Sequence, residues 1–166
     1  MGLRVPTTHP IDARLETLGI TLPPRSKPAG NYSAACRCGL TLFISGQFPL
    51  ENGRLKYAGQ VGCDLTPEEG YQATRLAALN VLSHVRHETD AWRQLERILR
   101  IDGHISSAQH FHEQPRVLDG ASDLFRQVLQ GQAGHARTVF APAALPLNSS
   151  VELVVIACLR AQCAEP

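Results

Sequence analysis

The chain has 166 residues, which fits one globular domain that can bury a core without disulfides or metals. Sixteen basic and fifteen acidic residues leave a formal charge of +1, so no strong positive field favours nucleic acid as a partner. The apolar runs at residues 40–45 and 151–159 are too short to span a bilayer, and residues 1–6 lack the apolar core of a signal peptide. We therefore expect a cytoplasmic protein with no membrane partner.

The cysteines predict no disulfide framework. Their number is odd and nothing at the N-terminus indicates export, so we expect reduced thiols. One residue separates Cys36 from Cys38, whereas structural zinc sites use wider pairs with further ligands at fixed spacing, so no metal is expected there. The five are Cys36, Cys38, Cys63, Cys158 and Cys163.

In chain order, residues 1–30 predict an extended N-terminal segment with one short helix. Several prolines flank apolar residues, among them Ile11 and Leu15, that recur at helical spacing. Residues 31–46 predict two antiparallel strands, since apolar and polar residues alternate over residues 40–45 and Gly39 stands at the turn. Asn52 and Gly53 form a second turn signal, and a further strand is expected over residues 54–61.

The second half of the chain predicts two helices and three strands. Thr66, Pro67 and Glu69 form a capping signal for a helix that runs to about residue 88. A strand is expected from residue 98 to residue 111, where Pro115 would break it, followed by a helix over residues 120–129. The last two strands are expected over residues 137–141 and 151–159.

The order of these elements is ββ(β)αβαββ. It predicts an α+β fold in which one mixed β-sheet carries two helices on one face. The expected organisation is an N-terminal extension over residues 1–30 and a single domain over residues 31–162.

Two charged residues stand out because their strands are otherwise apolar. Arg137 begins the run Thr138-Val139-Phe140, and Glu152 lies within the run 151–159. A buried charge must be paired or used, since an isolated one costs several kcal/mol. The pair can be a structural ion bridge between neighbouring strands, or the two residues can serve a ligand.

Several short motifs resemble the reactive intermediate deaminase family, also called the YjgF family, over about residues 28–160. The N-terminal lead-in and the segments 103–108 and 119–124 resemble a divergent, longer branch of that family. The motifs are Asn31-Tyr32, Leu42-Phe43-Ile44-Ser45-Gly46-Gln47-Phe48-Pro49, Gly62 with Asp64-Leu65-Thr66, Ala77-Ala78-Leu79-Asn80, Ala136-Arg137-Thr138-Val139, Leu145-Pro146 and Val151-Glu152.

The resemblance implies a chorismate-mutase-like subunit in a ring-shaped homotrimer, with three sites in the clefts between subunits. It implies that Arg137 holds a substrate carboxylate and that Glu152 helps to activate water, with no metal and no organic cofactor. The residue types fit, because guanidinium binds carboxylate through two hydrogen bonds and a carboxylate can take a proton from water.

The resemblance also places Tyr32, Ser45 and Gly46 in the same cleft. Tyr32 can stack on the substrate, or it can be a half-buried aromatic at a strand edge. Gly46 allows close approach of the backbone and Ser45 adds a hydroxyl, although the same sequence also suits a turn that ends a strand.

Two departures from the family pattern concern the substrate. The typical active deaminase has a cysteine two residues after the arginine, where this chain has Val139, so only backbone groups of Val139 are expected to contribute. An asparagine that many members place at the start of the second helix has no clear counterpart here. Asp119 or Ser122 would have to substitute for it.

Histidines and arginines give further candidates. His104, His110 and His112 share parity and could hold a metal, but solvated histidines at a strand end are the favoured interpretation. His135, two residues before Arg137, is a secondary substrate-binding candidate because its charge depends on pH. The run Arg93, Arg97 and Arg100 is interrupted by acids and lacks aromatic interleaving, so it predicts a solvated face and not a nucleic-acid patch.

Taken together, these features predict hydrolytic deamination of a carboxylate-bearing imine or enamine to a keto product and ammonia. The rival is a non-catalytic trimeric protein that binds a small ligand such as a keto acid, or that regulates a partner. It would keep Arg137 but would need no water-activating Glu152. Endoribonuclease activity is a minor alternative that rests on labels given to some family members.

Overall fold

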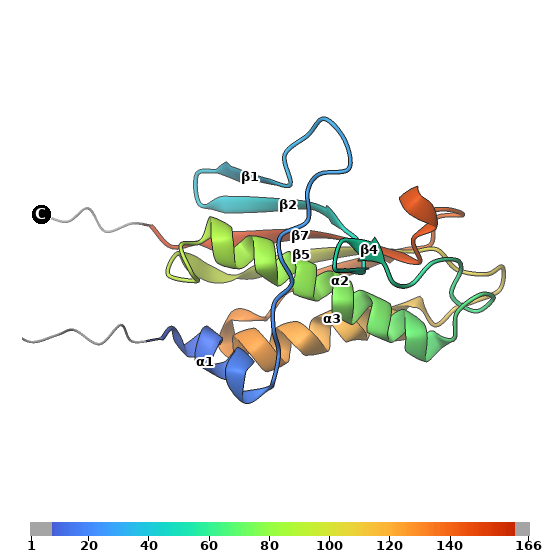
Figure 1. The fold of residues 1–166 in the computed structure, drawn as a ribbon, viewed down its shortest axis with the longest axis horizontal. Coiled ribbons are helices and arrows are strands. Elements are labelled where there is room, and N and C mark those ends of the chain that lie inside the picture. The colour runs from blue at the N-terminus through green and yellow to red at the C-terminus, as the bar shows by residue number, and fades with distance from the viewer. Residues whose placement is uncertain (1–7, 162–166) are drawn as a thin grey trace, which may run out of the picture.

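A five-stranded mixed sheet forms the centre of the fold (Figure 1). The computed structural model describes residues 8–161. The strands β5 and β6 pair in parallel, and the other neighbouring strands pair antiparallel. The strands in sheet order are β1 (Ala35–Cys38), β2 (Thr41–Gln47), β7 (Val151–Leu159), β5 (Leu95–Ile105) and β6 (Ala136–Phe140).

Two long helices, α2 (Pro67–Glu88) and α3 (Gln114–Leu129), cover one face of this sheet (Figure 1). The predicted start of α2 is confirmed by a capping box. The Glu69 N–H donates to Thr66 Oγ1 at 3.2 Å, and the Thr66 N–H donates back to Glu69 Oε2 at 2.8 Å. The predicted α+β architecture, one mixed sheet with helices on one face, is therefore confirmed.

The boundary between β5 and α3 differs from the prediction. The strand ends at Ile105 and not at residue 111, and α3 begins at Gln114 and not at residue 120. Pro115 was expected to break a strand, but it occupies the first turn of the helix, where the missing N–H has no partner to lose. The earlier start adds more than one turn and brings Asp119 into the helix that was already expected to contain Ser122.

A small hairpin lies outside the main sheet. β3 (Leu50–Glu51) and β4 (Arg54–Leu55) pair across the predicted turn, where Asn52 and Gly53 both have positive φ. The expected strand over residues 54–61 is wrong beyond Leu55. Gly59 has a φ of 97° there, which interrupts an extended chain.

The second face of the sheet is covered by no helix of the described chain. Along β7, side chains alternate between buried and partly exposed, and Glu152 belongs to the partly exposed set. Phe43 and Phe140 lie on the same open face and are 44% and 47% exposed. The face is therefore largely apolar, with Glu152 among its few charges.

The N-terminal segment contains the predicted short helix, α1 (Pro10–Thr17), which packs on α3. Ile11 and Leu15 are buried in the common core, and Asp12 accepts a hydrogen bond of 2.9 Å from the indole of Trp92. Residues 1–7 and 162–166, which include the N-terminal sequence examined for a signal peptide and Cys163, lie outside the described residues. Between residues 8 and 161, no helix is long and apolar enough to cross a membrane.

Candidate functional site

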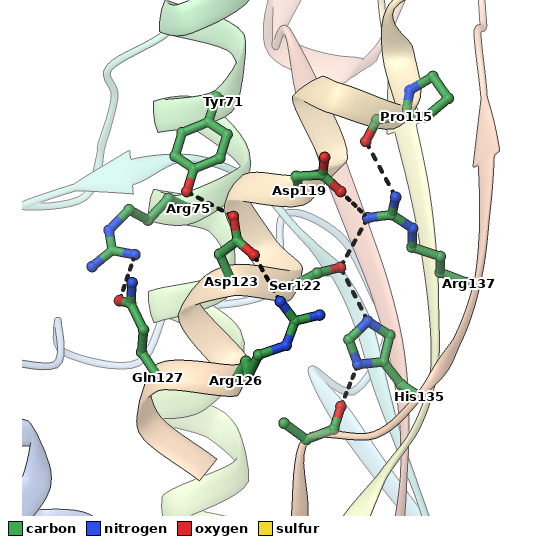
Figure 2. Close-up of polar contacts among 11 residues, drawn as sticks. Tyr71, Arg75, Pro115, Asp119, Ser122, Asp123, Arg126, Gln127, His135 and Arg137 are labelled. Atoms are coloured by element: carbon green, nitrogen blue, oxygen red, sulfur yellow. Dashed lines mark hydrogen bonds and ion pairs between the residues drawn. The ribbon is translucent and has the colours of Figure 1, made fainter. Parts of the chain in front are cut away.

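Arg137 extends from β6 toward α3, where three groups hold its guanidinium (Figure 2). Nη1 lies 2.7 Å from Asp119 Oδ1 and donates to Ser122 Oγ at 3.0 Å. Nη2 donates to the Pro115 carbonyl at 3.4 Å. Pro115, Asp119 and Ser122 are spaced by four and three residues, so they form one stripe of α3 that faces β6.

These contacts leave part of the guanidinium free. Nε–H and one N–H of Nη2 have no acceptor within residues 8–161. Nε and Nη2 form one edge of the planar group, and two parallel donors on such an edge match the two oxygens of a carboxylate. Arg137 is thus anchored by the protein on one side while it keeps a carboxylate-binding edge.

His135 continues the network behind Arg137 (Figure 2). Its Nδ1 lies at hydrogen-bond distance from the Ala133 carbonyl, which can only accept, so Nδ1 carries the proton. Nε2 therefore accepts from the Ser122 hydroxyl at 3.1 Å. Burial lowers the pKa of His135, as do the nearby charges of Arg137 and Arg126, although the bond to Ala133 acts in the opposite direction.

The groups around Arg137 line a pocket of about 580 Å³. Asp119 is the one carboxylate among its lining residues in the described chain, and Arg126 supplies a second guanidinium. The pocket can therefore hold an anionic group while one acid remains nearby. The lining consists of Asp119, Ser122, Arg126, Gln130, Gly131, Ala133, Gly134, His135 and Arg137.

Glu152 lies on the open face of the sheet beside Gly46. The Gly46 backbone is so close that an added Cβ would lie 1.7 Å from Glu152 Oε1, so only glycine leaves room for this carboxylate. Burial raises the pKa of the half-buried Glu152 carboxyl, and the charge of His104 opposes that rise. His104 is the cross-strand neighbour of Glu152, and its ring stacks on Phe140 at 5.1 Å.

Tyr32 and Ser45 lie on the Gly46 side of the molecule. Tyr32 is 48% exposed, and its hydroxyl accepts from the Ala29 N–H at 3.2 Å. Together with Gly46 it lines a pocket of about 120 Å³. Ser45 Oγ donates to the Ser33 carbonyl at 2.8 Å, and this bond holds the β2 hydroxyl against the loop before β1.

A buried hydrogen-bond chain supports the same end of β2. Ser26 Oγ donates to Gln47 Oε1 at 2.8 Å, and Gln47 Nε2 donates to the Ser45 carbonyl at 2.9 Å. The Ser26 proton is thereby used, so His84 Nε2 must donate to Ser26 Oγ at 3.1 Å. Nδ1 of His84 is buried without a partner in the described part of the chain. Burial, reinforced by the charge of Arg25, lowers the pKa of His84.

Arg137 and Glu152 do not meet within one subunit. β5 lies between their strands, and Arg137 faces α3 whereas Glu152 lies on the open face. The possible structural ion pair between them is therefore wrong, because Arg137 pairs with Asp119 instead. Val139 lies on the helix side with Arg137 and packs on the core. The sequence-predicted residues thus form two groups: Arg137, Ser122, His135 and Val139 near α3, and Glu152, Gly46, Ser45 and Tyr32 near the Gly46 end of β2.

The remaining candidates are dispersed. His110 and His112 are exposed in the loop after β5, whereas His104 is partly buried by Phe140, so the interpretation of three solvated histidines is wrong for His104. Over residues 8–161, no group of three His, Cys, Asp or Glu side chains could hold a metal ion. Cys36, Cys38 and Cys63 are exposed free thiols.

The sequence analysis missed several groups that hold the site side chains in place. It did not identify the Pro115 carbonyl, the chain from His84 to Ser45, or His104 beside Glu152. The spacing of Pro115, Asp119 and Ser122 could have indicated a helix stripe, had the start of α3 been placed correctly.

Comparisons with known proteins give one consistent family. The family model described as "YjgF/chorismate mutase-like, putative endoribonuclease" matches residues 12–159. The curated protein TCP17 of Trypanosoma cruzi is 35% identical over 144 residues, which are 86% of this chain and 90% of that protein. A crystal structure titled "putative endoribonuclease", from Shewanella oneidensis MR-1, is 35% identical with a TM-score of 0.88 and covers 91% of this chain and 100% of its own. TdcF of E. coli, solved with bound serine, shares the fold at 18% identity and a TM-score of 0.59, covering 81% and 92% of the two chains.

Proposed function

This chain belongs to the YjgF/chorismate mutase-like family, and on that premise we propose that it hydrolyses a carboxylate-bearing imine or enamine to a keto product and ammonia. The reaction needs no cofactor, because a protonated imine is already electrophilic. The observation that carries the proposal is Arg137 itself: α3 holds its guanidinium, two of its N–H donors on one edge stay free of protein acceptors within residues 8–161, and the residue lines a pocket.

Arg137 binds the substrate carboxylate. Its contacts with Asp119, Ser122 and Pro115 restrict the side chain before the ligand arrives, so less rotamer freedom is lost on binding. Backbone groups of Val139, two residues along β6, are available on the same strand. The serine bound to TdcF is a small carboxylate ligand in a protein of this fold, which supports the same ligand class here.

Glu152 acts as the base. Because burial raises its pKa, the carboxylate is a stronger base than an exposed glutamate. As the water oxygen forms a bond to the imine carbon, Glu152 takes one proton from the water, and the C=N electron pair moves to nitrogen. The resulting carbinolamine then loses the nitrogen. The protonated Glu152 gives its proton to the nitrogen, the C–N bond breaks and ammonia leaves, and the hydroxyl proton passes to the Glu152 carboxylate or to solvent as the keto group forms.

The site is completed between subunits of a homotrimer. One small ligand cannot contact Arg137 and Glu152 of the same subunit, because their strands are two spacings of about 4.8 Å apart and the side chains lie on opposite faces. A second copy that brings its Glu152, Gly46, Ser45 and Tyr32 to the Arg137 pocket removes this difficulty. The exposed Phe43 and Phe140 on the open face supply apolar surface for such an assembly. Light scattering coupled to sizing tests the assembly, and a monomer at micromolar concentration would contradict it.

The catalytic step is tested with imines generated in solution. An amino-acid oxidase forms 2-iminopropionate or 2-iminobutyrate, and semicarbazide traps what the protein has not hydrolysed. We expect wild type to accelerate hydrolysis, and Glu152→Gln to lose about a hundredfold or more of that acceleration while it still binds carboxylates. Arg137→Lys should lose carboxylate affinity by about 2–5 kcal/mol in a calorimetric titration with pyruvate, because a point charge replaces a two-donor edge.

The same experiment distinguishes imine hydrolysis from the rival function, ligand binding without catalysis. A protein that binds carboxylates through Arg137 but accelerates no imine hydrolysis would be a non-catalytic ligand-binding protein. Equal acceleration by wild type and Glu152→Gln would remove Glu152 from the role of base.

A further inference from the structure

We propose that Ser26, Gln47 and His84 are positioning residues that fix the Glu152 carboxylate through the backbone beside it. Ser26 belongs to the strap, the extended segment over residues 20–28 that lies between α1 and β1 and crosses α2 (Figure 1). The strap thereby supports the site and is more than a lead-in to the domain. This inference rests on the proposed role of Glu152 as the base, and it adds the groups that hold the base in place.

Ser45 and Gly46 form a bulge in β2, because these two residues stand opposite the single residue Val154 of β7. The regular ladder is interrupted at a bulge, so other contacts must fix its backbone. The Glu152 carboxylate lies against this bulge, since a Cβ on Gly46 would be 1.7 Å from Oε1. A displacement of the Gly46 backbone therefore changes the space that the carboxylate occupies.

A buried chain of hydrogen bonds holds the bulge on the helix side of the sheet. Gln47 Nε2 donates to the Ser45 carbonyl at 2.9 Å, and Ser26 Oγ donates to Gln47 Oε1 at 2.8 Å. His84 Nε2 donates to Ser26 Oγ at 3.1 Å, so both roles of the hydroxyl are used. Gln47 and His84 are 3% and 1% exposed, so a lost bond leaves a buried group unpaired. The chain thus fixes the Gln47 amide, and the amide fixes the Ser45 carbonyl.

The bulge is also a junction with the loop that carries Tyr32. The Ser45 N–H donates to the Ala34 carbonyl at 3.0 Å, which ties the bulge to this loop. Ser26, Tyr32 and Gly46 line one pocket of about 120 Å³. A shift of the bulge would therefore disturb the Tyr32 loop as well as the Glu152 carboxylate.

The alternative role for the chain is to stabilise the fold only. The two roles differ in what Ser26→Ala does when the base is already absent. A positioning residue acts through Glu152, so its loss costs little in a Glu152→Gln background. A purely structural residue lowers the rate by the same factor in both backgrounds, because its effect is independent of Glu152.

Ser26→Ala tests the proposal, with Ser83→Ala as its matched control. Ser83 Oγ donates to the Pro23 carbonyl, so its loss removes another hydroxyl contact between the strap and α2 but leaves the bond to Gln47 intact. Hydrogen exchange read by mass spectrometry measures opening of the bulge without any substrate. We expect the segment over residues 43–48 to exchange at least about tenfold faster in Ser26→Ala, and at the wild-type rate in Ser83→Ala.

The semicarbazone assay then measures the effect on the base. Ser26→Ala should lose at least about tenfold of the acceleration of imine hydrolysis, since a shift of about 1 Å in an active site can cost a hundredfold. Its affinity for pyruvate should stay within about threefold of wild type, because Arg137 lies in the other group of site residues. In the Glu152→Gln background, Ser26→Ala should cost less than about twofold.

The outcomes separate this inference from the proposed function. Unchanged exchange in Ser26→Ala, or faster exchange without loss of hydrolysis, would overturn the positioning role and leave Glu152 as the base. An equal loss in Ser83→Ala, or the same loss in both backgrounds, would also overturn it, because general loosening of the strap would then be the cause. A wild-type protein that accelerates no imine hydrolysis would overturn both. Melting curves for each variant check that the fold is retained.

Discussion

The glycine beside Glu152 permits a test in which one methyl group moves the proposed base. In Gly46→Ala, the new Cβ would lie 1.7 Å from Glu152 Oε1 and 2.6 Å from its Cδ, whereas ordinary contact begins at 3.4 Å. The carboxylate must therefore withdraw by about 1.7 Å. A shift of about 1 Å in an active site can cost a hundredfold, so we expect the acceleration of imine hydrolysis to fall by at least that factor.

The fold should survive this change. The φ of Gly46 lies outside the left-handed region, and the group that must move is the end of a flexible side chain. Thermal unfolding should shift by no more than a few degrees. The semicarbazone assay is run beside Glu96→Gln, which changes a half-exposed carboxylate near the start of β5, outside both groups of site residues, and should keep its activity. Unchanged turnover in Gly46→Ala, with the fold intact, would refute the placement of the base.

Three further changes test the packing that holds the site. Gly120→Ala places a Cβ 2.1 Å from the Tyr71 carbonyl oxygen. The overpacking cost of about 1–3 kcal/mol should exceed the gain in helix propensity of about 1 kcal/mol, so urea unfolding should show a net loss of stability. Because the pKa of His84 is lowered in the folded protein, the unfolded chain binds a proton more readily, and the free energy of unfolding should fall as pH drops below about 6.5. In melting curves recorded at several pH values, His84→Gln should show a smaller fall than wild type. Equal pH dependence of the two proteins would refute the assignment to His84. Asp12→Ala leaves the buried Trp92 N–H unpaired and should cost about 1–3 kcal/mol by the same unfolding assay, against no change if water replaces the carboxylate.

Much of the fold could be predicted because local signals agreed with one another. The capping residues at Thr66, the alternation around Ile44 and the apolar run of β7 each specify an element without knowledge of the rest of the chain. The position of Pro115 led to a wrong boundary, because a proline can end a strand or begin a helix. The packing of α3 on α2 selects the helix here.

The site was predictable only in part. Arg137 and Glu152 attract attention because each is a charge in an apolar strand, yet their separation depends on β5 lying between β6 and β7. That order comes from a parallel crossover, which side-chain alternation does not encode. The role of Asp119 needed the true start of α3, because the helix expected over residues 120–129 contains Ser122 but begins after Asp119.

The central position of the last strand has a consequence for synthesis of the protein. β7 pairs with β2 on one side and with β5 on the other. Until β7 has been synthesised, β2 and β5 therefore each have one edge whose backbone groups lack their partner strand. At roughly 5–20 residues per second, the interval from the end of β5 to the end of β7 lasts several seconds. During that time the nascent chain exposes apolar edges that favour aggregation, and a chain that stops before β7 never closes its core.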